Sequence, residues 1–111
     1  MNRRRRTYGG WEDMEIIKQI SNENVINVNY RELTDAYKYV GIIIEELRLD
    51  QSISNGVIFQ RLSAGHKYII SLTSAEVNED INYITIEVDS DGYISVGNLA
   101  SIYTLTFLGS N

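Results

Sequence analysis

The sequence predicts an α+β fold, with one short and one long N-terminal helix followed by a four- to five-stranded antiparallel meander sheet. Two observations lead to this fold class. Apolar residues recur at the helical period over residues 30–49, whereas from residue 53 onward they alternate with polar residues, as in strands with one buried face. Because an amphipathic helix and an alternating sheet each have one face to bury, the long helix is expected to pack on one sheet face.

The short helix is expected over residues 11–21. Glu12, Asp13 and Glu15 stand in its first turns, where the helix dipole favours negative charge. The stretch VINV, residues 25–28, follows and is interpreted either as a short strand or as an extended entry to the next element. Within residues 11–21 an apolar stripe recurs every third residue, at Trp11, Met14, Ile17 and Ile20.

The long helix is expected between residues 30 and 49. Asn29 is suited to cap its first turn and Glu32 to complete a capping box, while Val28 and Leu33 stand where a hydrophobic staple would place them. The apolar spacing predicts that this helix buries one stripe against the sheet, formed by Leu33, Tyr37, Val40, Ile44 and Leu47.

β-Branched and aromatic residues alternate with polar ones in the second half of the chain, which favours strands. The expected strands are residues 56–62, 67–73, 82–88, 93–96 and 101–108. Residues 63–66 form a hairpin-length loop, and the Asp-Gly pair within residues 89–92 is a strong hairpin signal. The alternation turns one set of side chains toward the core: Ile84, Ile86, Val88, Ile94, Val96, Tyr103, Leu105 and Phe107.

The charge is distributed unevenly along a chain of 111 residues with a formal net charge of −5. Residues 1–10 are expected to form a flexible basic arm, and residues 11–111 a single domain. Residues 7–111 hold six Lys and Arg against fifteen Asp and Glu, a net charge of −9. Such a surface repels nucleic acids and anionic lipids and favours a basic partner. The arm has the opposite preference, because it carries Arg3, Arg4, Arg5 and Arg6.

Two motifs offer candidate chemistry. Residues 87–98 partly fit a calcium-binding loop, with Glu87, Asp89 and Asp91 at alternate positions, but Asn98 occupies the place of the bidentate glutamate. The pattern therefore favours a hairpin turn. His66 is the only histidine and could act as a general base, but it lies in a hairpin loop without a surrounding motif, which favours an exposed turn residue.

Other enzyme signatures are absent from the sequence. It has no cysteine, which excludes disulfides and thiolate chemistry, and it contains no phosphate-binding loop or zinc-protease motif. The longest apolar stretch, residues 40–44, is too short to span a bilayer. We therefore expect a non-enzymatic cytoplasmic domain without cofactor, metal or membrane association.

Two groups of side chains are candidates for binding. Exposed tyrosines suit interfaces, although they also suit strands, and predicted outer faces carry Tyr30, Tyr39, Tyr83 and Tyr93. Acidic residues at the end of the long helix and in the loop after residue 73 would attract a basic partner if they gathered, although acidic residues are often simply solvated. These residues are Glu45, Glu46, Asp50, Glu76, Glu79 and Asp80.

The leading hypothesis is a non-catalytic protein-binding domain whose acidic surface docks on a basic protein, such as a nuclease or another nucleic-acid-binding protein. Small acidic α+β proteins are common among phage-encoded inhibitors of host defence nucleases, and this analogy makes inhibition by charge mimicry the specific form of the hypothesis. The alternative is a nucleic-acid-associated accessory protein that contacts phosphates through the arginine arm. A monomer and a homodimer formed through a sheet face both remain open.

Overall fold

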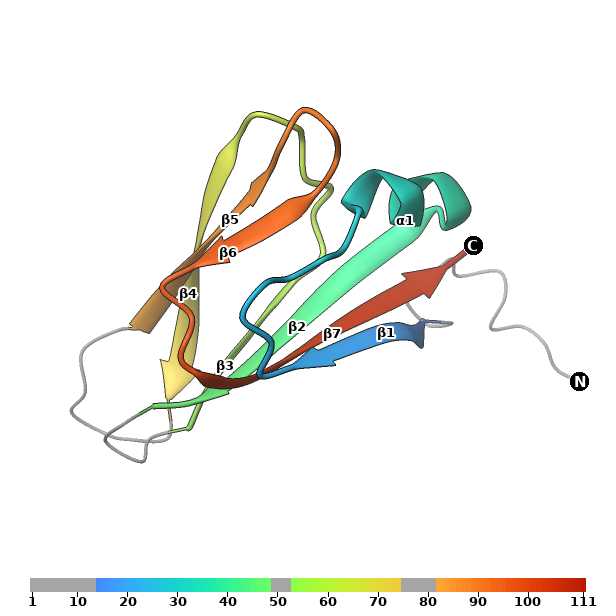
Figure 1. The fold of residues 1–111 in the computed structure, drawn as a ribbon. Coiled ribbons are helices and arrows are strands. Elements are labelled where there is room, and N and C mark those ends of the chain that lie inside the picture. The colour runs from blue at the N-terminus through green and yellow to red at the C-terminus, as the bar shows by residue number, and fades with distance from the viewer. Residues whose placement is uncertain (1–13, 49–52, 75–81) are drawn as a thin grey trace, which may run out of the picture.

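The computed structural model describes residues 14–48, 53–74 and 82–111. This part of the chain is mostly β, with a seven-stranded antiparallel sheet and one short helix (Figure 1). The elements in chain order are β1 (Glu15–Ser21), α1 (Tyr30–Ala36), β2 (Tyr39–Leu47), β3 (Ile53–Ile58), β4 (Lys67–Ser74), β5 (Asn82–Val88), β6 (Ile94–Gly97) and β7 (Ile102–Ser110). No helix in these ranges is long and apolar enough to cross a membrane.

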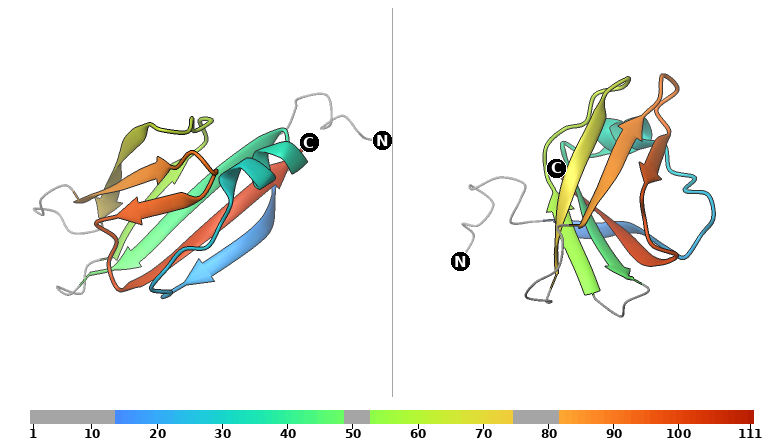
Figure 2. Two further views of the ribbon diagram at one scale, coloured as in Figure 1. Left: turned by 45° about the horizontal axis from the view of Figure 1, so that its top comes forward. Right: turned by 90° about the vertical axis from the view of Figure 1, so that its left-hand side faces the viewer.

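The sheet has the strand order β1-β7-β2-β3-β4-β5-β6. β2 pairs with β7 over its whole length, whereas β3 and β4 pair only at Ser54 with Ser74 and at Asn55 with Thr73. Around this narrow joint the sheet curls into a half-barrel, so that β4, β5 and β6 face back toward β1, β7 and β2 (Figure 2). The strands expected after residue 53 follow one another in the sheet from β3 to β6, but β7 does not continue this meander and returns to lie between β1 and β2.

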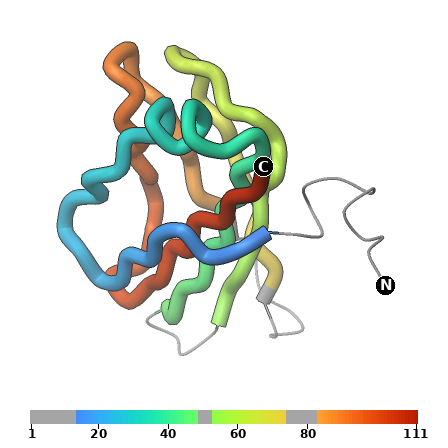
Figure 3. Tube along the Cα trace, turned by 90° about the vertical axis from the view of Figure 1, so that its right-hand side faces the viewer, coloured from blue at the N-terminus to red at the C-terminus, as the bar shows by residue number. Residues whose placement is uncertain are grey.

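Residues 22–29 cross the open side of the half-barrel, between its two edge strands β1 and β6 (Figure 3). At its end this segment pairs briefly with the start of β6. The Ile94 N–H donates to the Val28 carbonyl (3.0 Å), and the Tyr30 N–H donates to the Gly92 carbonyl (2.7 Å). The segment is an extended entry to α1 and contains no strand, which decides between the two interpretations of residues 25–28.

The core fills the space that the curled sheet encloses. Its largest fully buried apolar side chains come from β2, β5 and β7, and these are Ile44, Ile84, Ile86, Leu105 and Phe107. The alternation predicted from sequence is confirmed for Val88, Ile94 and Tyr103, which are also buried, and Val96 packs partly buried against them. The predicted strands 67–73, 82–88, 93–96 and 101–108 match β4 to β7 closely.

The prediction of a long helix over residues 30–49 is wrong. The helix ends at Ala36, and residues 39–47 form β2 instead. The predicted cap is confirmed, because the Asn29 side chain accepts the Glu32 N–H (3.1 Å). The predicted burial of Val40 and Ile44 is correct, but they belong to a strand, while Leu33, Tyr37 and Leu47 are only partly buried.

The physical reason is that residues four apart share a face in both a helix and a strand. Val40 and Ile44 therefore fit either period. The run Ile42 to Ile44 is β-branched and loses side-chain freedom in a helix, so it favours the pleated sheet. The expected fold, with a long helix packed on a sheet, is replaced by a sheet that encloses its own core.

The predicted helix over residues 11–21 is also wrong where the structure describes it, because residues 15–21 form β1. β1 pairs with β7, and the register shifts between Ile16 and Lys18, as at a β-bulge. A bulge adds one residue to a strand, so Ile17 and Ile20 both pack against the core although they lie three residues apart. The bulge thus produces the spacing that indicated a helix.

Two further expectations need correction. β3 covers Ile53–Ile58 instead of residues 56–62, so the connection to β4 spans residues 59–66 and is longer than a tight hairpin. Tyr30, expected on an outer face, is buried. Its hydroxyl accepts the Leu62 N–H (3.1 Å), and burial raises the pKa of this hydroxyl despite that hydrogen bond. Tyr30 therefore anchors the longer connection to the helix.

Candidate binding face of the sheet

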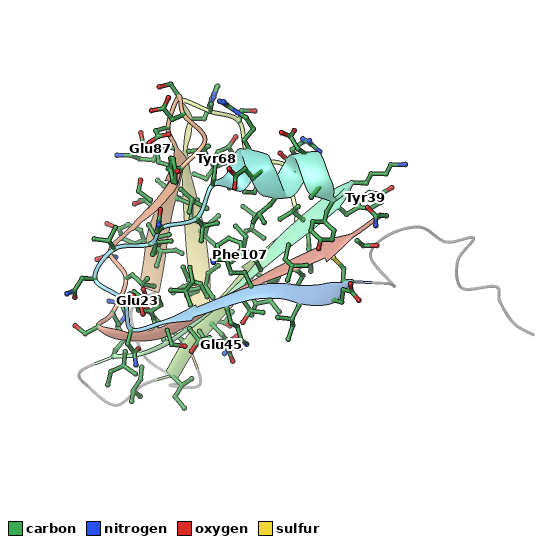
Figure 4. All side chains as sticks on the ribbon, turned by 45° about the vertical axis from the view of Figure 1, so that its right-hand side comes forward. Glu23, Tyr39, Glu45, Tyr68, Glu87 and Phe107 are labelled. Atoms are coloured by element: carbon green, nitrogen blue, oxygen red, sulfur yellow. The ribbon has the colours of Figure 1, made fainter. Side chains whose placement is uncertain are left out.

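The side of β7, β2 and β3 that points away from the core forms a continuous surface, which we call the outer face. Along β2 the even-numbered residues from Val40 to Glu46 are buried inside, so the odd-numbered residues lie outside. Figure 4 shows Phe107 in the enclosed core and Glu45 on the opposite side of the sheet. Strand alternation and the pairing registers give the described members of the outer face: Tyr39, Gly41, Ile43, Glu45, Leu47, Ile53, Asn55, Val57, Ile102, Thr104, Thr106, Leu108 and Ser110.

Exposed apolar side chains stand at both ends of the outer face. At one end Leu47 lies between Ile53 and Ile102, which are 58% and 55% exposed. Toward the other end Ile43 pairs with Val57, which is 49% exposed. Exposed apolar side chains that cluster in this way mark an interaction site more often than scattered single residues do.

Phe59 extends this apolar surface just beyond β3. A Cβ atom placed on Gly41 would come within 2.4 Å of the Phe59 ring, so the ring lies directly over this glycine. Phe59 is still 43% exposed. The missing side chain at Gly41 therefore makes room for the Phe59 ring, whose Cδ1–Cε1 edge lies against this glycine.

Glu45 is the one charged side chain among the described members of the outer face. It is exposed, and its neighbours across the strands are Asn55 and Thr104. A sheet face that stays in water normally alternates apolar residues inside with polar and charged residues outside. The outer face instead has a single carboxylate between two apolar ends.

The residues of the predicted acidic patch fall in different environments. Glu45 is exposed, but Glu46 is only 3% exposed and points into the half-barrel. Its carboxylate accepts hydrogen bonds from Arg48 Nε and from the Ala100 N–H (3.0 Å). Glu46 is therefore a structural residue that holds the connection between β6 and β7 and is not available to a partner. Four members of the predicted patch lie outside the described residues, namely Asp50, Glu76, Glu79 and Asp80.

The predicted exposed aromatics do not form one cluster. Tyr83 and Tyr93 are about half exposed, but they lie at opposite ends of the β5–β6 hairpin. Tyr39 lies at the start of β2, partly buried, with the Lys38 ammonium 5.5 Å from its ring centre. The arm residues Arg3, Arg4, Arg5 and Arg6 lie outside the described residues.

The Asp-Gly sequence forms the predicted hairpin turn between β5 and β6. One oxygen of Asp89 accepts the N–H groups of Asp91 and Tyr93, both at 2.9 Å, and Gly92 has a φ of 97°. The carboxylate that a calcium site would need is thus committed to the turn. Over the described ranges no group of three or more His, Cys, Asp and Glu side chains is placed to hold a metal.

His66 lies exposed in the β3–β4 connection, as predicted. Its Nδ1 is 3.3 Å from the Ala64 carbonyl, and its ring is tilted against Tyr68 at a centroid distance of 6.5 Å. Both contacts are local. They place this imidazole in a turn and bring no described carboxylate or hydroxyl nucleophile to it.

Sequence reasoning misses the outer face because its central strand, β2, lies within the stretch predicted as a long helix. The available signal was the run from Val40 to Ile44, in which both the inner and the outer positions of a strand are apolar or glycine. A half-solvated strand would alternate, so such a run indicates a strand covered on both faces. Comparison of the chain with family models, with curated proteins and with solved structures gave no match.

Proposed function

We propose that this chain is a non-catalytic protein-binding domain and that its outer face is the binding surface. The observation that carries the proposal is the combination of Ile53, Ile102, Val57 and Phe59, all about half exposed, with a single charge, Glu45, among the outer-face positions. Interfaces concentrate apolar and aromatic residues at their centre and exclude most charges from it.

The construction of the outer face supports this role. Its strands are fixed from behind by the fully buried Phe107, Leu105 and Ile44, so the face is held in shape before any partner arrives. A preorganised surface loses less conformational entropy on binding than a mobile loop does. Association through such a face would be driven mainly by burial of apolar area.

Glu45 gives the proposed partner a second property. A carboxylate that lies between two apolar groups loses hydration when a partner covers the face, and it needs a hydrogen-bonded cation or donor to compensate. The partner surface is therefore apolar with a Lys or Arg opposite Glu45. This agrees with the basic partner expected from the net charge of the chain. The specific function that we propose is inhibition of a nucleic-acid-handling protein.

The test compares capture by three forms of the protein. Wild type, Val57→Lys and Ile69→Lys are immobilised and exposed to lysate of the native host, and the bound proteins are quantified by mass spectrometry. Ile69 is the matched control, because it is an exposed apolar residue on β4, outside the outer face. A partner of the outer face is depleted at least about tenfold, ~1.4 kcal/mol, by Val57→Lys and within twofold unchanged by Ile69→Lys.

The purified partner is then titrated against the same three forms, with Glu45→Lys added. The substitution at Glu45 is expected to weaken binding and to reverse the effect of salt on the association rate. Equal depletion by Val57→Lys and Ile69→Lys, or no selective depletion at all, would contradict the proposal.

A further inference from the structure

A groove of about 530 Å³ lies on the open side of the half-barrel, between β6 and residues 22–26. It is separate from the outer face, because none of its lining residues belongs to that face. The apolar part of its lining comes from both sides, with Ile26 on the crossing segment and Val96 on β6, and Leu99 follows at its end.

The backbone of β6 presents a strand edge to this groove. The Ile94 N–H donates to Val28, which lies on the side away from β5. Alternate residues of a strand direct their N–H and C=O groups to the same side, so Val96 also points these groups away from β5 and toward the crossing segment. Its pairing with Ile86 is consequently of the non-hydrogen-bonded kind.

The crossing segment begins to pair with this edge and then leaves it. Asn29 bridges Tyr93, and Val28 accepts the Ile94 N–H, but no hydrogen bond joins the Val96 backbone to a described residue on this side. Farther back the segment is held elsewhere. The Glu23 N–H donates to the Tyr103 hydroxyl (3.1 Å), which in turn donates to the Glu23 carbonyl (2.9 Å).

The groove therefore lies where the pairing between the crossing segment and β6 stops, and both of these elements are held in place. An added strand lies about 4.8 Å from its neighbour, and it would continue the pairing that the chain itself starts at Val28. An edge with unpaired N–H and C=O groups is a template for another extended chain. The divergence of residues 22–26 from β6 leaves room for that chain, whereas a second sheet edge would meet the crossing segment.

We propose that this groove binds an extended segment of another polypeptide, which adds to β6 as a strand through the Val96 N–H and C=O. This is recognition by β-strand addition, in which backbone hydrogen bonds supply affinity and alternate side chains supply specificity. The site goes beyond the outer face and is independent of it, so one can fail without the other.

Charge determines the composition of the bound segment. Glu23 is the one charged residue among those that line the groove, and it is exposed on the crossing segment (Figure 4). The other polar lining residues, such as Asn24 and Ser95, are neutral. The segment therefore carries a Lys or Arg near Glu23 and small apolar side chains toward Ile26 and Leu99.

The probe is a library of random linear twelve-residue peptides, selected on the full-length wild-type protein. The enriched peptides are synthesised and titrated by calorimetry against wild type, Val96→Pro and Glu23→Lys, with the outer-face variant Val57→Lys as control. Proline at 96 removes the N–H that faces the groove and leaves the β5–β6 ladder intact, because this N–H does not take part in it.

The expected result is an enriched family of basic peptides that bind at least tenfold more weakly to Val96→Pro and to Glu23→Lys, but equally to wild type and Val57→Lys. N-methylation of every second peptide residue should abolish binding when the methylated N–H groups face β6 and should spare it when they face away. Recognition by side chains alone would not produce this alternation. Glu23→Lys lies in an exposed segment and keeps the test valid if Val96→Pro fails to fold.

Three outcomes would overturn the inference. These are selection of no binder, binding that tolerates every N-methyl position, and binding that survives Glu23→Lys and a folded Val96→Pro. A fourth result would assign the edge to a second copy of this chain and would also refute the peptide as occupant. That result is concentration-dependent dimerisation of wild type, measured by sedimentation, which Val96→Pro removes.

Discussion

Replacement of Glu46 by alanine tests the role that the structure gives to this residue. The Glu46 side chain is 0% exposed and accepts hydrogen bonds from the Arg48 guanidinium and from the Ala100 N–H. Arg48 also donates to the Asn98 carbonyl (3.1 Å). One carboxylate thus fixes the connection by which the chain leaves β6 and crosses to β7.

The magnitude follows from what each partner loses. The partly buried Ala100 N–H would be left without its acceptor, and the penalty for an unsatisfied buried donor, about 1–3 kcal/mol, is an upper range for it. Arg48 would lose its counterion, but its side chain is 24% exposed and can reach water. The cost is therefore lower than the roughly 3–5 kcal/mol of breaking a fully buried ion pair. We therefore expect Glu46→Ala to lower the free energy of unfolding by about 2–4 kcal/mol.

The assay is urea unfolding followed by far-ultraviolet circular dichroism, with the slope of the transition checked for constancy. Glu45→Ala is the matched control, because this neighbouring glutamate is exposed on the outer face. It should change stability by no more than about 0.5 kcal/mol. Equal effects of the two substitutions, or a loss below about 1 kcal/mol for Glu46→Ala, would refute the assignment of Glu46 to the interior.

Three further predictions follow from the core, the buried tyrosine and the arginine arm. Phe107→Ala should cost about 3–5 kcal/mol of stability by cavity formation, measured by the same urea titration, and a smaller cost than Ile44→Val would contradict the described core. Burial raises the pKa of Tyr30 above its ordinary value of 10.0, so the folded state keeps this proton longer than the unfolded state. The free energy of unfolding should therefore keep its full value below pH 10.0 and fall as the pH rises above 10.0. Tyr30→Phe should lack this fall, and identical pH profiles for the two proteins would contradict the raised pKa of Tyr30. Deletion of residues 2–7 should weaken partner binding by less than about 100-fold (~2.7 kcal/mol) and abolish weak duplex binding whose salt slope is about −3.6; tight, steeply salt-dependent duplex binding lost with the arm would favour the nucleic-acid hypothesis.

The strands of the C-terminal half could be predicted because their apolar residues recur every second position, which fits a strand and no other element. Ile84, Ile86 and Val88 alternate with polar residues, and this spacing fits a strand but not a helix. The Asp-Gly turn after them needs only local backbone geometry, which its sequence specifies. Local information therefore determined these elements and their buried faces.

The N-terminal half could not be predicted in the same way, because its spacings were ambiguous. Val40 and Ile44 fit both a helix and a strand, and the bulge in β1 gave Ile17 and Ile20 a helical separation. Only the tertiary partner decides such cases, and here that partner is β7, which lies between β1 and β2. The assignment of Glu46 to the surface failed for the same reason, since a helix and a strand turn this residue in different directions.

The position of β7 also has a consequence for how the protein is made. β1 and β2 are translated early, yet each pairs along one edge with β7, whose residues are separated from theirs by about half of the chain or more. Contacts between residues so distant in sequence slow folding. While the ribosome is still adding residues 102–110, the two early strands have unpaired edges toward each other. Unpaired edges of this kind favour association between nascent chains until synthesis reaches this last strand.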